Sequence, residues 1–340
     1  MAAKALLYCA GGGIGDSLVA SIVARALHAR YETVDALTLP AHASTLERVP
    51  DIDGVLVDNA EDEGDLARKL ASRGYDAAVV TWATPRTARV PHLAGIPVRV
   101  GQARRLYSWH FTHRVTVRSE HGDLTSHWSD ILLDYARELG CDTNDVLPRF
   151  ETTQTDREDA QALLESLSLH DRPFAIVHTT NAIAPQRGIW PTQGWVQLVR
   201  AIRQRFDLDV ALSGTDADRE ILDRIARESG AVTIAGRASI GGFAAIAQRA
   251  RFFAGITTGS MHIAAAVGAP TVGIFPFQTD TPERWAPLGV RTAIVRASYP
   301  CRPGERKETC PDYACIANLD VPRILAAAES VSTAANPASP

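Results

Sequence analysis

The chain has 340 residues and a net charge of −4, with 46% hydrophobic and 22% charged residues. This length usually means two domains, and the apolar content excludes a disordered chain, while the negative charge argues against a dedicated nucleic-acid-binding protein. No apolar run approaches the ~20 residues of a membrane span, and the five cysteines, an odd number, favour a reducing compartment, so we expect a cytoplasmic protein.

Apolar runs bounded by turn residues alternate with amphipathic stretches in the first half of the chain. This alternation is typical of a parallel sheet with helices on both faces. The strands are expected at residues 5–10, 34–39, 54–57, 77–80 and 98–100, and helices at 17–30 and 128–139.

A polar, non-periodic segment at residues 142–155 contains Pro148 and is the best candidate for a domain boundary. We therefore predict one domain over residues 1–150 and a second over 151–332. Residues 333–340 are rich in Ala, Ser, Pro and Asn and are expected to form a flexible tail.

The second half repeats the alternation of strands and helices. The sequence thus predicts an α/β fold of two doubly wound, Rossmann-like domains, with the carboxyl ends of their strands facing one cleft between the domains. The strands are expected at residues 174–178, 210–213, 232–235, 252–256, 271–275 and 292–295, and helices at 192–206, 217–229 and 260–267.

The first strand runs into a glycine-rich loop, residues 11–15. Gly13 and Gly15 allow a ligand to approach the backbone closely, and the start of a helix favours an anion. A dinucleotide fingerprint fails because Asp16 stands where its third glycine belongs, and the Gly-Lys-Ser/Thr of a P-loop is absent. A nicotinamide-dependent oxidoreductase is therefore disfavoured.

Asp16 has two interpretations. It can be the N-cap of the following helix, accepting a backbone N–H bond, or it can be a general base. A helix N-terminus should lower the pKa of this carboxylate and weaken it as a base. A weak base is sufficient for glycosyl transfer, because an oxocarbenium-like transition state lets the acceptor proton leave late.

Residues 86–118 contain seven arginines and no Asp or Glu, with Tyr107, Trp109 and Phe111 between them. The segment is either a solvated basic face or a cradle for a polyanionic acceptor or an anionic membrane surface. The local excess of positive charge favours the second interpretation, so we predict that acceptor-binding side chains include Arg86, Arg89, Arg104 and Arg105.

Two helix starts in the second half carry polar side chains. Thr257, Thr258 and Gly259 precede a helix and offer hydroxyls and free N–H groups for a pyrophosphate, and His262 can either donate to the same anion or be a buried structural residue. Asp218 and its neighbour at 216 start another helix, where capping, a ribose contact and a metal site are the alternatives.

Several segments, in this order and spacing, resemble glycosyltransferase family 9, the ADP-heptose:lipopolysaccharide heptosyltransferases. The resemblance covers nearly the whole chain and implies a GT-B fold without a cofactor or metal. It also implies inverting transfer of heptose from ADP-heptose to an anionic saccharide such as lipopolysaccharide inner core, by an enzyme that contacts the inner membrane peripherally. The segments include GGGIGDSLVASIVARAL, SHWSDILLDYARELG, IWPTQGWVQLVRAI, LSGTDADREIL and TTGSMHIAAAVGAPTVGIF.

The resemblance also implies roles for single residues. Asp16 matches the catalytic base of the family, and Asp218 matches an acidic position near the ribose. The donor-binding positions are Thr179 and Thr180 in a hydroxyl-bearing loop, and Thr258, Gly259 and His262 in the pyrophosphate loop.

The chain departs from the family pattern at two donor positions. Gly188 replaces a common lysine, whose charge Arg187 can supply, and Thr257 replaces a common aspartate that touches the sugar. Another nucleotide sugar, a protein hydroxyl as acceptor, or a non-catalytic sugar-nucleotide-binding protein are therefore the alternatives. The thiols of the last segment either bind a metal with a fourth ligand or belong to a structural loop; they are Cys301, Cys310 and Cys315.

Overall fold

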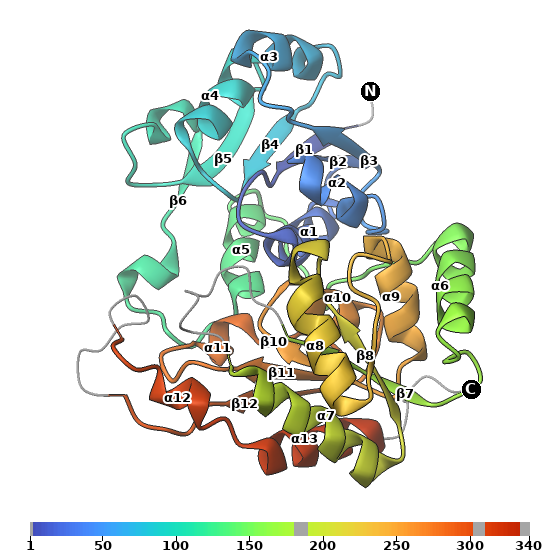
Figure 1. The fold of residues 1–340 in the computed structure, drawn as a ribbon. Coiled ribbons are helices and arrows are strands. Elements are labelled where there is room, and N and C mark those ends of the chain that lie inside the picture. The colour runs from blue at the N-terminus through green and yellow to red at the C-terminus, as the bar shows by residue number, and fades with distance from the viewer. Residues whose placement is uncertain (1–2, 180–189, 302–309, 334–340) are drawn as a thin grey trace. The chain divides into compact units, whose positions relative to one another are not determined.

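The computed structural model describes residues 3–179, 190–301 and 310–333. The predicted tail therefore lies outside the described residues except for residue 333, and so do Thr180, Arg187 and Gly188. The chain forms two compact units, residues 1–151 and 152–340, drawn from blue to green and from green to red in Figure 1.

Unit 1 contains a six-stranded sheet in the order β3-β2-β1-β4-β5-β6. All neighbouring strands are parallel, and the order reverses between β1 and β4. Five strands are confirmed, whereas β6 was not predicted because its three residues carry one apolar side chain. The strands are β1 Lys4–Tyr8, β2 Thr33–Thr38, β3 Gly54–Val57, β4 Ala77–Val80, β5 Val98–Gln102 and β6 His113–Val115.

Helices cover both faces of this sheet. In Figure 1, α3 and α4 lie on one face, and α1, α2 and α5 lie on the other. The short helices α2 and α4 were not predicted, although each has a proline in its first turn, where the missing N–H costs nothing. The helices are α1 Ile14–Leu27, α2 Pro40–Leu46, α3 Glu63–Ala71, α4 Pro85–Leu93 and α5 Trp128–Arg137, with 3-10 turns Ser108–His110 and Arg118–His121.

Unit 2 repeats the topology with the order β12-β11-β10-β7-β8-β9. Here the order reverses between β7 and β10, and every strand lies where the sequence predicted one, to within two residues at either end. The strands are β7 Phe174–His178, β8 Asp209–Ser213, β9 Val232–Thr233, β10 Phe253–Ile256, β11 Thr271–Phe275 and β12 Thr292–Arg296.

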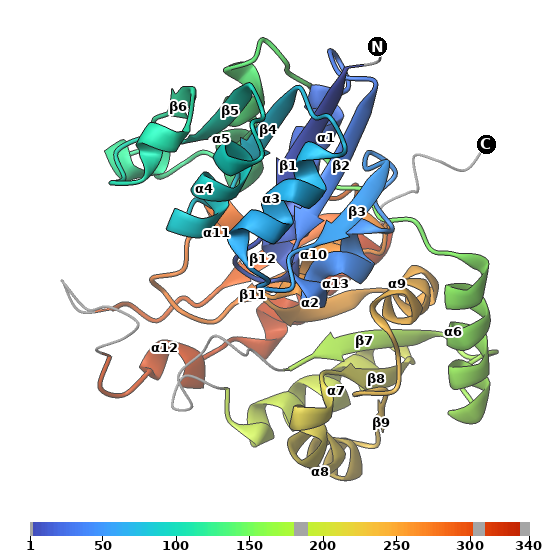
Figure 2. The ribbon, with the colours of Figure 1, turned by 90° about the horizontal axis from the view of Figure 1, so that it is seen from above.

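The helices of unit 2 form two groups, α6, α9 and α10 on one face of the sheet and α7, α8 and α13 on the other (Figure 2). No helix in the described ranges is long and apolar enough to span a membrane. The helices are α6 Gln154–Ser166, α7 Thr192–Phe206, α8 Arg219–Ser229, α9 Ile240–Arg249, α10 Gly259–Ala266, α11 Pro282–Trp285, α12 Ala314–Ala317 and α13 Val321–Thr333, with a 3-10 turn Asp216–Asp218.

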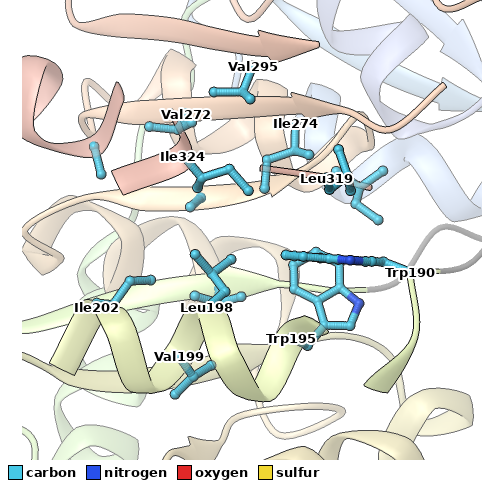
Figure 3. Close-up of a cluster of buried hydrophobic side chains, with 14 of the residues drawn as sticks. Trp190, Trp195, Leu198, Val199, Ile202, Val272, Ile274, Val295, Leu319 and Ile324 are labelled. Carbon is cyan, nitrogen blue, oxygen red and sulfur yellow. The ribbon is translucent and has the colours of Figure 1, made fainter. Parts of the chain in front are cut away.

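Trp190 and Trp195 anchor the core of unit 2. Their indoles pack edge to face, with 4.7 Å between the ring centres. Figure 3 shows them with apolar side chains such as Val272 of β11 and Val295 of β12. Gly194 makes this packing possible, because a Cβ there would lie 2.4 Å from the Trp190 indole. The core thus fixes the start of α7.

Candidate functional site

The loop after β1 ends earlier than the sequence predicted. Helix α1 begins at Ile14, so Gly15 and Asp16 lie inside its first turn, and Gly13 is the N-cap in an extended conformation. The Gly13 N–H donates a 2.7 Å hydrogen bond to Oδ2 of Asp16. Asp16 is therefore the third residue of the helix, where it closes a capping interaction, and the expectation that it is the N-cap itself is wrong.

Burial raises the pKa of Asp16 above the ordinary value, and the hydrogen bond from Gly13 and the nearby His42 ring offset this only in part. The expected lowering by the helix terminus is wrong, because desolvation of the carboxylate outweighs it. A carboxylate with a raised pKa is a stronger base than an exposed aspartate. Asp16 therefore combines a fixed orientation with an increased proton affinity.

Asp16 lies where the strand order of unit 1 reverses. Tyr8 at the end of β1 pairs with Val80 at the end of β4, and open doubly wound sheets bind ligands at such a switch point. Asp16 shares a small pocket with Trp82, which follows β4, and with Trp128, the first residue of α5. Sequence reasoning did not single out these two tryptophans, although the position of Trp82 just beyond a predicted strand is a usable signal.

Arg86 is committed to a buried ion pair. Its Nη2 lies 2.6 Å from Oδ1 of Asp58, and the hydroxyl of Tyr8 donates to Oδ2 of the same carboxylate at 2.5 Å. Burial alone would raise the pKa of Asp58, but the hydrogen bonds from Arg86 and Tyr8 lower it below the ordinary value. This network joins β1, the end of β3 and the start of α4.

The other predicted acceptor arginines differ in whether a carboxylate pairs with them. Arg89 pairs with Glu63 at 3.1 Å, and Arg105 pairs with Glu120. Arg104 contacts the His121 ring at 2.9 Å, and in the described part of unit 1 no carboxylate pairs with it. The acid-free stretch of sequence thus receives carboxylates that the fold brings from outside it.

An exposed apolar surface lies beside these arginines. Leu106 is 99% exposed, Trp109 62% and Leu93 52%, and these three line an open hollow of about 530 Å³ with His92 and Tyr107. The indole of Trp109 stacks on His110 at 3.7 Å between ring centres. We call Leu93, Leu106 and Trp109 the apolar rim.

The switch point of unit 2 carries small hydroxyl side chains. Thr179 follows β7 and Thr258 follows β10, and these two strands are parallel neighbours, with His178 opposite Gly255. The hydroxyl oxygens of Thr179 and Thr258 are buried and have no hydrogen-bond partner among the residues described. Because buried polar groups nearly always have partners, both oxygens are candidates for contact with a bound ligand.

Thr258 is also the N-cap of α10, in an extended conformation, and its side chain does not cap the helix. Gly259 is the first helical residue, and His262 is buried on the same helix. The unpaired N–H groups of a helix start attract anions. The Thr257 hydroxyl donates to the carbonyl of Ile274 at 3.5 Å.

Asp218 has a local role. Its Oδ2 accepts from the N–H and the hydroxyl of Thr215, at 2.8 and 2.7 Å, while Asp216 pairs with Arg219. This is the capping arrangement that was one of the predicted alternatives, and it leaves Oδ1 of Asp218 for a further contact.

The cysteines of the last segment form no recognisable metal centre among the described residues. The Tyr313 N–H donates to Sγ of Cys310 at 3.3 Å, and Cys315 is buried in α12. Within the described ranges, no group of three His, Cys, Asp or Glu side chains is arranged to hold a metal ion.

Two doubly wound units of this kind are the architecture of GT-B glycosyltransferases, and solved structures of that class superpose on the chain. A family 9 glycosyl transferase from Veillonella parvula matches with a TM-score of 0.85 at 16% identity, over 98% of both chains. The ADP-heptose lps heptosyltransferase II of E. coli gives 0.77 at 19% identity, over 97% of this chain and 98% of that one. The E. coli heptosyltransferase WaaC with ADP-2-deoxy-2-fluoro heptose gives 0.65 at 19%, over 86% and 93%.

The family model of glycosyltransferase family 9 (heptosyltransferase) matches residues 64–314. The chain therefore belongs to glycosyltransferase family 9, and it is a glycosyltransferase.

Proposed function

We propose that the enzyme transfers heptose from ADP-heptose to an anionic saccharide acceptor such as lipopolysaccharide inner core, with inversion and without a metal ion or other cofactor. The observation that carries the proposal is the pair of buried hydroxyl oxygens of Thr179 and Thr258, which have no hydrogen-bond partner among the described residues. They flank the start of α10, where a diphosphate would satisfy them together with the free N–H groups of the helix.

In this proposal unit 2 binds the donor. The Gly259 backbone and His262 contact the pyrophosphate, and Thr257 lies near the transferred sugar. Oδ1 of Asp218, which the Thr215 cap leaves available, accepts from a ribose hydroxyl. Thr180 and Arg187, predicted from the sequence, complete the donor loop. Two similar solved proteins favour ADP-heptose, since one is an ADP-heptose transferase and the other holds ADP-2-deoxy-2-fluoro heptose.

Unit 1 supplies the base in this proposal. Asp16 removes the proton from the acceptor hydroxyl as that oxygen attacks the anomeric carbon of the donor. The bond from this carbon to the diphosphate oxygen breaks in the same step, so the configuration inverts. The raised pKa of Asp16 favours proton uptake, and the hydrogen bond from Gly13 holds the carboxylate in place. The helix start after Thr258 stabilises the departing diphosphate.

The acceptor side of the proposal rests on the surface of unit 1. Arg104, with support from Arg89 and Arg105, binds the phosphates of the acceptor. The apolar rim fits the headgroup region of an anionic bilayer, where tryptophan and leucine side chains partition beside cationic ones. We therefore place the enzyme at the cytoplasmic face of the inner membrane, in peripheral contact with it.

The decisive experiment is transfer by the purified protein with EDTA present. ADP-heptose, UDP-, GDP- and CMP-sugars are each offered with a deacylated inner-core oligosaccharide lacking the terminal heptose, and NMR reports the anomeric configuration of the product. Inverted heptose transfer supports the proposal, and transfer of another sugar or onto a protein hydroxyl replaces its donor or acceptor. Donor binding without transfer or hydrolysis would establish the non-catalytic alternative, and a metal requirement would contradict the proposed mechanism.

A further inference from the structure

Trp82 stands at the switch point of unit 1, just beyond β4, the strand next to the one that leads to Asp16. It lies two residues beyond Val80, and Gly11 lies three residues beyond Tyr8, which pairs with Val80. The loops that leave β1 and β4 therefore start side by side at the carboxyl edge of the sheet. Ligands of doubly wound sheets bind at this place.

The indole of Trp82 is held rigidly. A Cβ on Gly11 would lie 2.1 Å from Cγ and Cδ1 of Trp82, so the ring rests directly against the backbone of the glycine loop. The carbonyl of Trp82 accepts from the hydroxyl of Thr87 at 2.8 Å, and Thr87 also forms the capping box of α4 with Thr84. Both the ring and its backbone are thus fixed before any ligand binds.

This fixed ring remains 41% exposed. Covering a large aromatic side chain with a ligand lowers the free energy, because apolar surface leaves water. An exposed aromatic ring beside a reactive group is therefore a typical binding feature. Trp82 and Trp128 line the same pocket as Asp16. The space that these three side chains enclose is only about 10 Å³, so a sugar ring does not fit inside it and can cover only the exposed part of Trp82, beside the half-buried Asp16 carboxylate.

Pyranose rings match this combination. One face of such a ring carries axial C–H groups that pack on an aromatic ring, while its hydroxyls lie around the edge and reach polar groups. We propose that Trp82 is the platform on which the acceptor pyranose stacks, with the attacked hydroxyl directed to Asp16. This inference rests on the proposed function, because it takes Asp16 as the base of the transfer.

Stacking on Trp82 is made equally in the ground state and the transition state, since the acceptor ring itself does not change shape during attack. Its loss should therefore raise the KM for the acceptor and change kcat little. We expect Trp82→Ala to raise the acceptor KM about tenfold and Trp82→Phe about threefold. The Kd for the donor, measured by calorimetry, should stay the same in both variants.

The matched control is Tyr299→Ala, which removes an aromatic ring of similar exposure, 46%, from unit 2. It should leave the acceptor KM at the wild-type value. An unchanged acceptor KM in Trp82→Ala, in an enzyme that transfers sugar, would overturn the platform while the proposed function stands.

A direct binding measurement tests whether the acceptor contacts Trp82 without requiring that the enzyme transfers sugar. Protein labelled with 5-fluorotryptophan is titrated with the deacylated inner-core oligosaccharide without donor, and the ¹⁹F signal of Trp82 is identified by its absence in Trp82→Phe. A saturable shift of this signal, retained in Asp16→Asn, supports the platform even if no transfer is detected. An unmoved Trp82 signal, at concentrations where another tryptophan responds, contradicts it. This measurement also decides the question if Trp82→Ala does not fold.

Discussion

The two units share a topology and use its switch point in opposite ways. In unit 1 the loops after β1 and β4 bring the half-buried carboxylate of Asp16 next to the partly exposed indole of Trp82. In unit 2 the described residues that follow β7 and β10 include two small hydroxyls, Thr179 and Thr258, and the start of a helix. In the proposed function the same sheet edge serves proton transfer in one unit and binds an anion in the other, because the loops carry the chemistry and the scaffold only positions it.

The tryptophans show the same contrast. Trp82 and Trp109 of unit 1 are 41% and 62% exposed, whereas Trp190 and Trp195 of unit 2 are 3% and 0% exposed. The indoles of Trp190 and Trp195 stabilise the core of unit 2, whereas those of Trp82 and Trp109 are exposed enough to contact a ligand or a surface. Residue type alone therefore does not separate structural from functional aromatic side chains.

The largest effect is expected from Asp16→Asn, which removes the base and keeps the shape of the side chain. We expect kcat to fall by about 10²- to 10⁴-fold, while calorimetry gives an unchanged donor Kd, because donor binding belongs to unit 2. In the wild type, kcat should fall at low pH with an apparent pKa above the ~3.9 of an exposed aspartate, since burial raises the pKa of Asp16.

The matched control for that experiment is Asp156→Asn in unit 2. Asp156 is also the third residue of its helix and accepts from the Thr153 N–H at 2.9 Å, so the substitution weakens an equivalent capping interaction. It should cost about 1 kcal/mol of stability and leave kcat unchanged. Equal losses of kcat in the two variants would show that Asp16 only caps its helix.

The next largest effect concerns stability and separates the arginines of unit 1. Arg86→Met leaves the Asp58 carboxylate buried without its counter-ion, and we expect a loss of about 3 kcal/mol in urea unfolding. Because the folded-state pKa of Asp58 is lowered, the ion pair contributes fully above the unfolded pKa of ~3.9. Its contribution is lost as the pH falls from there through the lower folded pKa.

Arg104→Met, with no carboxylate partner among the described residues of unit 1, should change stability by less than about 0.5 kcal/mol and should raise the acceptor KM. If Arg86→Met is as stable as the wild type and raises the acceptor KM instead, Arg86 binds substrate and the ion pair is dispensable.

These arginines also show what the sequence could predict and what it could not. The strands were predictable because apolar runs between turn residues are local, and Thr258 was proposed as a donor residue because it lies at the start of a predicted helix. The ion pairs of Arg86 and Arg105 were not, because Asp58 and Glu120 lie outside the segment whose charge was counted. The raised pKa of Asp16 was not predictable because it depends on burial by elements distant in the sequence. The packing of Trp82 against Gly11 was not predictable because it depends on the pairing of β1 with β4.

A smaller effect should follow from Thr258→Val, which keeps the shape of the side chain and removes the buried oxygen. A hydrogen bond to a charged group contributes about 1.5–3 kcal/mol, so we expect the Kd for ADP to rise at least about tenfold by calorimetry. Thr271→Val is the control in the same unit, because among the described residues the Thr271 hydroxyl bonds to the Ala269 carbonyl alone, at 2.8 Å. It should lower stability without changing ADP affinity, and equal ADP affinity in both variants would remove Thr258 from the donor site.

The smallest effect is expected at the apolar rim. Leu106→Glu should weaken binding to vesicles of phosphatidylethanolamine and phosphatidylglycerol about fivefold in co-sedimentation, since a leucine at a bilayer surface loses about 1 kcal/mol of partial burial. Val290→Glu, at a 58% exposed position of unit 2, carries the same added charge and should bind as the wild type does.

Equal losses in these two variants would assign the effect to net charge rather than to the rim. Binding to phosphatidylcholine vesicles should be weak for every variant, because the arginines beside the rim need anionic headgroups. Tight binding of the wild type to phosphatidylcholine vesicles would therefore show that the arginines do not contribute and that the apolar rim alone binds the bilayer.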